Sequence, residues 1–465
     1  MPPMTLVLIL IGALPLALAA VRWERRLVML MPALVVINGL PLRIGSSQVR
    51  IDQVAACLLL VPLLASLLSG KRALRVDATS IWVAALFVVN VIASAVNSPA
   101  PGYSLAQCAN LASAWVIYAI IQNSLDTRAE LDAFLRVFFW SAAAACATGV
   151  AAFLLATAGV PVGGAEVSTT AAENLTRAFG AFGTMVEPNI LGSFSAAVLV
   201  MSIVLLAAGL EYRAANAVAL VRATAALSAL ALVLSFTRSA WLGAVAGTAF
   251  VAVAGSRTLG LRKMRIVKPI ALLGALAIVV LLIPGSAGDF LSFKLQNLLN
   301  FTSRTAAFRL LTYSLALEQT WQHPILGWGT FTFAPLVAQG NDFMQYEGWR
   351  NLWIGNYVLL ALHDTGIVGL ALWVGMLWSV IVRGLRATRT LVDVDPAFAA
   401  RTLACTAAVV TLLIPFLATT GFSLGYTWLL IGLVGAHARL ATQALPAPGP
   451  LHSPPPQDLL PADAT

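Results

Sequence analysis

Long apolar runs recur along this chain from Met4 to Ala438, and they constrain its fold more than any other feature. Most of them approach the roughly 20 residues that a helix needs to cross the hydrocarbon core of a bilayer. Hydrophobic residues make up 60% of the chain and charged residues only 10%, so a soluble protein of this length could not cover its surface with polar side chains. An outer-membrane barrel would show short segments in which apolar and polar residues alternate. The sequence therefore predicts an all-α, polytopic integral membrane protein.

The apolar runs divide into thirteen candidate spans, of which the short second and ninth could be re-entrant. We therefore expect about 12–13 transmembrane helices, all in one membrane domain over residues 1–444. The candidate spans are 4–21, 27–42, 52–70, 78–96, 104–122, 133–158, 190–209, 217–236, 240–254, 269–285, 354–383, 400–419 and 424–438. Residues 445–465 are rich in proline and are predicted to form a disordered cytoplasmic tail.

The basic residues fall unequally on the two sides of the predicted membrane domain. Of the 28 Lys and Arg residues, 19 lie on one side, 8 on the other and one inside a span. Because Lys and Arg accumulate in cytoplasmic loops, the side with 19 should be cytoplasmic. This distribution accounts for the net charge of +9 without nucleic acid as a partner. The opposite, periplasmic side has the two longest connections, 159–188 and 286–352, and the second is large enough to form a lid.

Signals for a metal or a nucleotide are missing from the sequence. The four cysteines lie within apolar runs and show no spacing typical of zinc ligands. The chain has no Walker A loop and no dinucleotide-binding fingerprint, and no predicted cytoplasmic loop is large enough for a sugar-nucleotide domain. We therefore expect neither a metal nor a cofactor, and an activated substrate would have to arrive in the membrane.

Ionisable residues near membrane depth are functional candidates, because unpaired charge is costly there. Arg238 lies between two apolar runs, where its guanidinium could clamp a phosphate or simply anchor a helix end by reaching into the interface. His363 and Asp364 fall within the run 354–383 and must face protein or a cavity. Glu187 lies at the periplasmic end of the predicted span 190–209. It is followed closely by Asn189, a residue type that often caps helices.

The long outer connection adds a second set of candidates. Residues 308–321 show apolar positions at helical spacing and predict an amphipathic helix. Arg304 and Arg309 are five residues apart, which does not place them on one helical face, and either could be a solvated charge. His323 precedes a proline and opens the turn that contains Gly327 and Gly329, so it could equally be a turn residue.

Several segments together resemble the bacterial O-antigen ligase and polysaccharide polymerase superfamily, and they occur in the family's order. They are RIGSSQVRIDQVAACLLL (43–60), EPNILG (187–192), SFTRSAWL (235–242), RLLTYSLALEQTWQHPILGWG (309–329) and NYVLLALHDTGIVGL (356–370). The resemblance spans most of the chain, with one large outer loop where the family has its own.

The resemblance implies a membrane-embedded glycosyltransferase in the bacterial inner membrane, with its large loop in the periplasm. Such an enzyme moves a glycan from a polyprenyl diphosphate to a hydroxyl of a lipid or glycan acceptor. It needs no metal, because the leaving group is already a diphosphate, and other polysaccharide-assembly proteins are possible partners. Arg238 and Arg309 would bind the diphosphate, with Arg304 in reserve. The positions that would shape the site are Asn189, Gly327, Gly329, Asn356 and Gly366.

The sequence departs from the family at one position that matters for chemistry. The family has a His before the asparagine that matches Asn356, where it acts as the acceptor-activating base, and this chain has Gly355. The other candidate bases are His323, His363, Asp364, Asp342 and Glu187.

The departure leaves several functions open. The first is a ligase, and the second is a polymerase of O-antigen, capsule or exopolysaccharide units. A transporter or flippase of lipid-linked glycans should show inverted repeats and broken helices, which the sequence does not reveal. A scaffold without catalysis is the remaining alternative.

Overall fold

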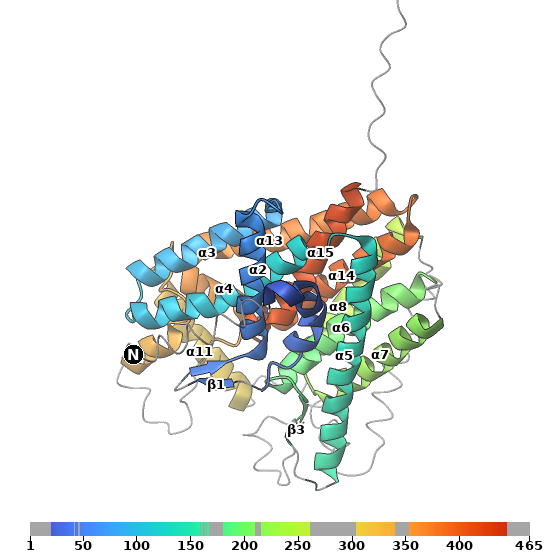
Figure 1. The fold of residues 1–465 in the computed structure, drawn as a ribbon. Helices are drawn as coiled ribbons and strands as arrows, with labels where there is room; N and C mark the ends of the chain where they lie inside the picture. Colours follow the sequence, from blue (N-terminus) through green and yellow to red (C-terminus); the bar gives the residue numbers. More distant parts are fainter. Residues whose placement is uncertain are drawn as a thin grey trace, which may run out of the picture.

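The computed structural model describes residues 20–40, 42–44, 47–158, 180–209, 215–260, 304–339 and 353–443, together with residues 160, 163 and 165–166. Within these ranges, nine helices are long and apolar enough to cross a membrane. The helices pack into one bundle, shown in Figure 1. The prediction of an all-α, multi-pass membrane protein is confirmed. The predicted spans 4–21 and 269–285 and the tail 445–465 lie largely or wholly outside the described residues.

Ten predicted spans coincide with helices of the structure, and the remaining elements are short. The helices are α2 (Ile51–Leu68), α3 (Ala78–Val96), α4 (Pro101–Ser124), α5 (Arg128–Thr157), α6 (Pro188–Ala207), α7 (Ala215–Leu234), α8 (Arg238–Thr258), α11 (Arg304–Thr320), α12 (Phe333–Gln339), α13 (Tyr357–Leu391), α14 (Pro396–Leu412) and α15 (Gly425–Gln443), with the 3-10 turns η2 (Pro415–Leu417) and η3 (Gly421–Ser423). Two antiparallel hairpins pair β1 (Leu42–Ile44) with β2 (Ser47–Val49) and β3 (Ala165–Glu166) with β4 (Gly180–Ala181).

The second predicted span, 27–42, is wrong at both ends. Residues 20–35 form one helix, which runs through the basic segment that was expected to be a loop, and β1 begins at Leu42. The helix stops where residues 38–39 dock on a distant segment: the side-chain oxygen of Asn38 accepts a hydrogen bond from the Val186 backbone N–H at 3.0 Å. A side chain at Gly39 would meet the Met185 carbonyl at 2.2 Å. This end depends on a tertiary contact that periodicity cannot reveal.

Helix α6 forms the centre of the bundle. Of its most apolar 18-residue window, 94% is buried inside the protein, and it packs against α7, α8 and α14. Its sequence is apolar on every side, which is typical of a helix surrounded by others rather than by solvent. The helices around it hold the ends of α6 in fixed positions, and the N-terminal end becomes part of the candidate site.

Helix α13 is broken at Gly366, a feature that the sequence did not reveal. The backbone at Gly366 has φ 63° and ψ −166°, a left-handed conformation that favours glycine. The freed N–H groups of Ile367 and Val368 donate to the carbonyls of Pro324 (2.9 Å) and Ile325 (3.3 Å). The loop after α11 thus supplies the hydrogen bonds that the helix lacks.

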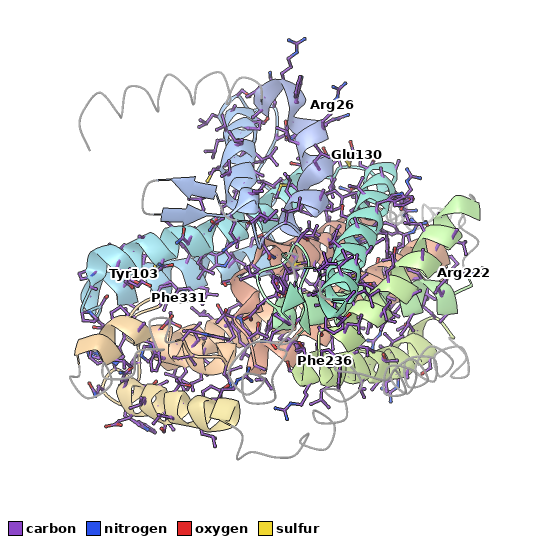
Figure 2. The ribbon with its side chains drawn as sticks, turned by 90° about the horizontal axis from the view of Figure 1, so that it is seen from below. Arg26, Tyr103, Glu130, Arg222, Phe236 and Phe331 are labelled. Carbon is purple, nitrogen blue, oxygen red and sulfur yellow. The ribbon has the colours of Figure 1, made fainter. Side chains whose placement is uncertain are left out.

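The same loop fills the space between α13 and the end of α3. Backbone N–H groups of Trp328 and Gly329 donate to the carbonyls of His363 (3.0 Å) and Asp364 (2.8 Å). A side chain at Gly327 would lie 2.4 Å from the Asp364 backbone, and φ there is 68°. The part of the outer connection formed by α11 and this loop is therefore integral to the bundle, with α11 (yellow) packed along α13 in Figure 2.

Candidate functional site

The N-termini of α6 and α8 lie together at one end of the bundle. The Thr237 hydroxyl joins them, because it lies 3.2 Å from the Pro188 carbonyl and 3.4 Å from the side-chain oxygen of Asn189. The α6 cap itself is Glu187 rather than the predicted Asn189, which instead helps to link the two helices. Each helix N-terminus carries a partial positive charge from its backbone dipole, so this end of the bundle favours an anion.

Arg238 is the first residue of α8, and a strained turn sets its position. Phe236, labelled in Figure 2, has a φ of 51°, which is unusual for a residue with a large side chain. The Phe236 ring is buried against Phe153 at 5.7 Å, and the Trp241 indole N–H donates to the Leu232 carbonyl at 2.9 Å. The turn between α7 and α8 is therefore fixed by packing on both sides of Arg238.

Arg309, on α11, lies within electrostatic range of Arg238. Its guanidinium Nη2 reaches the Ala418 carbonyl at 3.4 Å, in the segment between α14 and α15. One turn further along α11, the Tyr313 hydroxyl donates to the Gly355 carbonyl at 3.2 Å. Tyr313 thus places α11, which carries Arg309, beside the position where the family's His is missing.

Among the residues that the structure describes, Glu187 is the candidate base that lies in this cluster, and Asp342 lies outside the described residues. Burial raises the pKa of its carboxyl above the ordinary value, while a hydrogen bond with Asn189 and the positive charge of Arg309 oppose that rise. The carboxyl of Glu187 therefore holds a proton more tightly than a solvated glutamate does, and it interacts electrostatically with Arg309. We refer to Glu187, Asn189, Arg238, Arg309 and Tyr313 as the arginine cluster.

His363 and Asp364 form a separate and fully enclosed pair in α13. His363 Nδ1 lies 2.8 Å from an Asp364 carboxylate oxygen, and His363 Nε2 lies 2.9 Å from the Gln319 side-chain oxygen. The other Asp364 oxygen accepts the Phe331 backbone N–H at 2.7 Å. His363 is 0% exposed and Asp364 5% exposed. The contacts to Gln319 and Phe331 hold α11 and its loop to the broken helix, and the contact between His363 and Asp364 fixes the pair itself.

The remaining predicted residues occupy local structural positions. The side-chain oxygen of Asn356 accepts the Leu359 N–H at 3.2 Å and caps α13. His323 lies in the turn after α11, where its ring contacts Trp328 edge-on at 4.1 Å. A side chain at Gly355 would meet the Trp353 ring at 3.3 Å. Arg304 begins α11, and its side chain lies outside what the structure describes.

Arg50 is a charged residue at this end of the bundle that sequence reasoning did not single out. It pairs with the fully buried Asp52 at 3.1 Å, and its Nη2 lies 3.4 Å from the Ser423 carbonyl. Arg50 and Arg309 therefore both contact the segment between α14 and α15. The sequence carried a signal, because opposite charges two residues apart at the start of an apolar run have a cost unless they pair.

The comparison with known families agrees with this arrangement. A family model described as O-antigen ligase matches residues 223–374, about a third of the chain. No curated protein matches with significant similarity. The matched segment includes Arg238, Arg309 and the His363–Asp364 pair, whereas Glu187 and Asn189 lie outside it. Residues 223–374 are thus similar to an O-antigen ligase, and the nine apolar helices of the described residues are typical of a multi-pass membrane protein.

Proposed function

We propose that the protein transfers a glycan from a polyprenyl diphosphate to an acceptor hydroxyl, with the diphosphate bound by Arg238 and Arg309. The observation that carries this proposal is the junction of the α6 and α8 N-termini, where Arg238 begins α8 and lies within electrostatic range of Arg309, 71 residues further along the chain. Two like charges at a membrane protein's helix ends repel each other, and an anion bound between them would remove that repulsion. The positive ends of α6 and α8 add to the attraction.

A lipid diphosphate suits this cluster better than a soluble anion does. The cluster lies at the ends of membrane-crossing helices, so a prenyl chain could remain in the bilayer while its diphosphate reaches the arginines. Guanidinium groups bind phosphate oxygens in a bidentate manner and keep their charge when partly buried. The resemblance to O-antigen ligases points to the same class of donor.

The reaction follows from these assignments. The bond between the sugar carbon C1 and the diphosphate oxygen breaks, and a bond between C1 and the acceptor oxygen forms. Arg238 and Arg309 stabilise the negative charge that develops on the leaving oxygen. Glu187 accepts the proton of the acceptor hydroxyl, because it is the candidate base of the arginine cluster and its carboxyl interacts with Arg309.

We place the arginine cluster on the periplasmic side of the bacterial inner membrane. The opposite end of the bundle carries most of the basic residues, which supports a cytoplasmic location for that end. A polyprenyl-linked glycan that has already crossed the membrane lies in the periplasmic leaflet, and from there its diphosphate would reach the arginine cluster.

A polymerase is the second candidate, because Gly355 replaces the family's His and both reactions need the same donor site. A purified polyprenyl-diphosphate glycan, supplied to the reconstituted protein with and without a separate acceptor, distinguishes them. One modified acceptor indicates a ligase, and a ladder on the prenyl carrier indicates a polymerase. Absence of both products, with donor crossing the vesicle membrane, would overturn the proposal in favour of a transporter.

The broken helix does not by itself favour transport. In transporters, broken helices line an open substrate path near the middle of the membrane. Here the break at Gly366 is closed by the backbone of Pro324 and Ile325, and a side chain at Gly366 would lie 2.2 Å from the Ile325 carbonyl.

A further inference from the structure

A short segment before α6 carries Glu187, the proposed base, and this segment has no helix of its own. Residues 182–187 form turns and bends between β4 and the N-terminus of α6. Met185 is nevertheless only 1% exposed. Because no regular structure fixes the backbone here, contacts with other parts of the bundle determine where the Glu187 carboxyl lies. We refer to residues 180–187 as the base segment.

Residues 36–39 dock on the base segment through backbone and side-chain contacts. The Thr184 carbonyl accepts the Gly39 N–H at 2.8 Å, and the Thr184 hydroxyl donates to the Val36 carbonyl at 2.7 Å. A side chain at Gly39 would meet the Met185 carbonyl at 2.2 Å. The two stretches are therefore in direct contact, although Val36 and Thr184 are 148 residues apart in the chain.

Asn38 makes the contact of this docking that lies closest to Glu187 in the chain. Its side-chain oxygen accepts the N–H of Val186, the residue before Glu187, at 3.0 Å. Its Nδ2 lies 3.4 Å from the Val35 carbonyl and 3.3 Å from the Met185 sulfur. Asn38 is 1% exposed. The amide thus uses both of its ends to hold the backbone beside the proposed base.

Two glycines let other parts of the bundle approach the base segment closely. Gly183 has a φ of 57°, and a side chain there would lie 2.6 Å from the Gly149 nitrogen of α5. A side chain at Gly180 would lie 2.7 Å from the Ser235 carbonyl, in the turn between α7 and α8. Helix α5, this turn and Asn38 therefore each fix a different residue of the base segment.

We propose that Asn38 is a positioning residue that fixes Glu187 within the arginine cluster. The inference rests on the role of Glu187 in the proposed function, and Asn38 acts through the Val186 backbone rather than on the reacting atoms. The Val186 side chain is 53% exposed, so this part of the base segment lies at the surface. Without the Asn38 amide, the Val186 N–H would bond to water, and the segment would move toward solvent together with Glu187.

Such a movement changes how Glu187 titrates. Burial raises the pKa of its carboxyl, while the Asn189 hydrogen bond and the positive charge of Arg309 oppose that rise. The other ionisable groups at this end are Arg238 on α8 and Tyr426 on α15, and Tyr426 interacts electrostatically with Glu187. Burial is the largest of the effects on Glu187, so more contact with water should lower its pKa toward that of a solvated glutamate.

The direct test follows the protonation of Glu187 by infrared absorption during a pH titration of the purified, full-length protein. The carboxylic acid band that is missing in Glu187→Gln belongs to Glu187. Asn38→Ala should move the midpoint of this band to lower pH by about one pH unit, the usual scale on which a folded protein perturbs a carboxyl. In the transfer assay, kcat should fall about 10–10²-fold because the base is displaced, whereas KM for the polyprenyl-diphosphate donor should keep its wild-type value.

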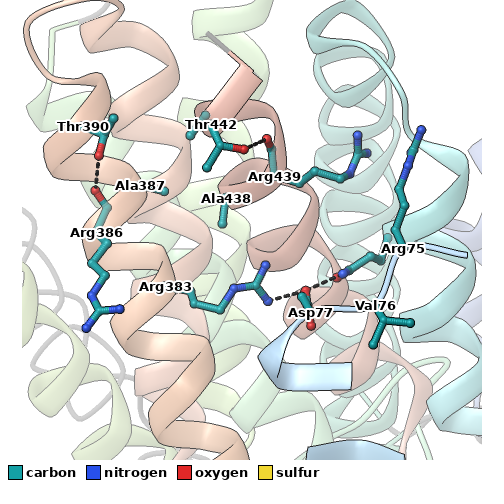
Figure 3. A pocket seen from close by; sticks show the side chains of 12 residues that line it. Arg75, Val76, Asp77, Arg383, Arg386, Ala387, Thr390, Ala438, Arg439 and Thr442 are labelled. Carbon is teal, nitrogen blue, oxygen red and sulfur yellow. Dashed lines mark hydrogen bonds and ion pairs between the residues drawn. The ribbon is translucent and has the colours of Figure 1, made fainter. Parts of the chain in front are cut away.

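Asn123 provides a matched control at the opposite end of the bundle. Its side-chain oxygen accepts the Arg75 N–H at 2.9 Å, and its Nδ2 donates to the Ala119 carbonyl at 2.8 Å. Arg75 lies there beside Asp77, at the cavity shown in Figure 3. Asn123→Ala thus removes an equivalent pair of hydrogen bonds far from the base segment, and the Glu187 midpoint should not change.

A second pair of variants tests the same docking without altering Asn38. Thr184→Val removes the hydroxyl that bonds to Val36 and should shift the Glu187 midpoint in the same direction by less, whereas Thr184→Ser retains the hydroxyl and should titrate as the wild type does. An unchanged midpoint in both Asn38→Ala and Thr184→Val, or an equal shift in Asn123→Ala, would overturn the inference. Full transfer activity in Glu187→Gln would instead contradict the proposed base, and the infrared result for Asn38 would stand on its own.

Discussion

Two polar groups lie near the start of α13, and they differ in how their hydrogen-bonding capacity is used. In the His363–Asp364 pair, every ring nitrogen and carboxylate oxygen has a protein partner within 3 Å. In the arginine cluster, Arg309 has a contact of 3.4 Å to a neutral carbonyl and lies within electrostatic range of Arg238 and Glu187. The first group is closed by protein partners, and the second is the one in which we propose that a ligand binds.

This difference separates structural from functional charge within a membrane. Both groups satisfy the criterion that an ionisable residue at membrane depth is a functional candidate. Their surroundings distinguish them, because a closed hydrogen-bond network stabilises one arrangement of the backbone, whereas two arginines within electrostatic range of each other would be stabilised by an anion between them. Four substitutions test this difference between the His363–Asp364 pair and the arginine cluster. Each should affect either the stability of the fold or the rate of glycan transfer.

The largest effect is expected for Gly366→Ala. The new methyl group would lie 2.2 Å from the Ile325 carbonyl, and alanine disfavours the left-handed backbone there. Strain and overpacking together should lower the free energy of unfolding by about 2–5 kcal/mol. Thermal unfolding of the purified protein measures this loss. Gly102→Ala in α4 is the control, because its methyl group would meet nothing within 4 Å, and an equal loss in both variants would contradict the account.

Arg238→Ala should leave the protein folded but lower the rate of glycan transfer by about 10²–10³, as expected for loss of one donor to a developing negative charge. The measurement is product formation from a purified polyprenyl-diphosphate donor at equal amounts of folded protein. Arg257→Ala, an exposed arginine at the other end of α8, serves as the matched control. A wild-type rate of transfer in Arg238→Ala would contradict the assignment of Arg238 to the donor site.

Glu187→Gln tests the proposed base and should lower the transfer rate by about 10². The wild-type rate should rise with pH, because only the deprotonated carboxyl accepts a proton and burial raises its pKa above the usual range. The glutamine variant cannot titrate at this position, so its residual rate should lose that rise. A pH profile of transfer, recorded for both proteins, decides this point. Identical profiles would mean that another group activates the acceptor.

The smallest effect on transfer is expected for His363→Leu. Removal of the ring leaves the Gln319 amide and one Asp364 oxygen without their partner, at a cost of about 1–3 kcal/mol in the free energy of unfolding. The transfer rate per folded molecule should stay at the wild-type level. Chemical denaturation and the transfer assay, done on the same preparation, test both statements. Loss of transfer with an unchanged free energy of unfolding would indicate instead that His363 acts as a base in the reaction.

The sequence predicted those parts of the fold that depend on local pattern. The span 78–96 coincides with α3, because an apolar run follows the capping residue Asp77 directly. The end of the helix at residue 35 and the break at Gly366 were missed, since both depend on backbone contacts with distant segments. A glycine within a long apolar run looks the same in sequence whether the helix continues or breaks.

The candidate site was predictable only in part. Arg238 could be predicted from the sequence itself, because apolar runs flank it on both sides. Its association with Arg309 came from the family resemblance, because the spacing of two residues along a chain carries no information on their distance in the fold. Arg50 was counted as one of several outer charges, and its buried partner Asp52 becomes apparent only in the folded protein. His363 was a candidate because, like Arg238, it is an ionisable residue near membrane depth. Only the structure reveals that its ring is fully buried.

Direct binding of a polyprenyl diphosphate tests the central claim that Arg238 and Arg309 share one anion. The measurement is a titration of a short-chain polyprenyl diphosphate without sugar into the wild type, the two single alanine variants and the double variant. Each single variant should weaken binding at least tenfold, roughly the value of one charge-assisted contact, and the double variant should lose less than the sum of the two single losses. Unchanged affinity in both single variants would contradict the account.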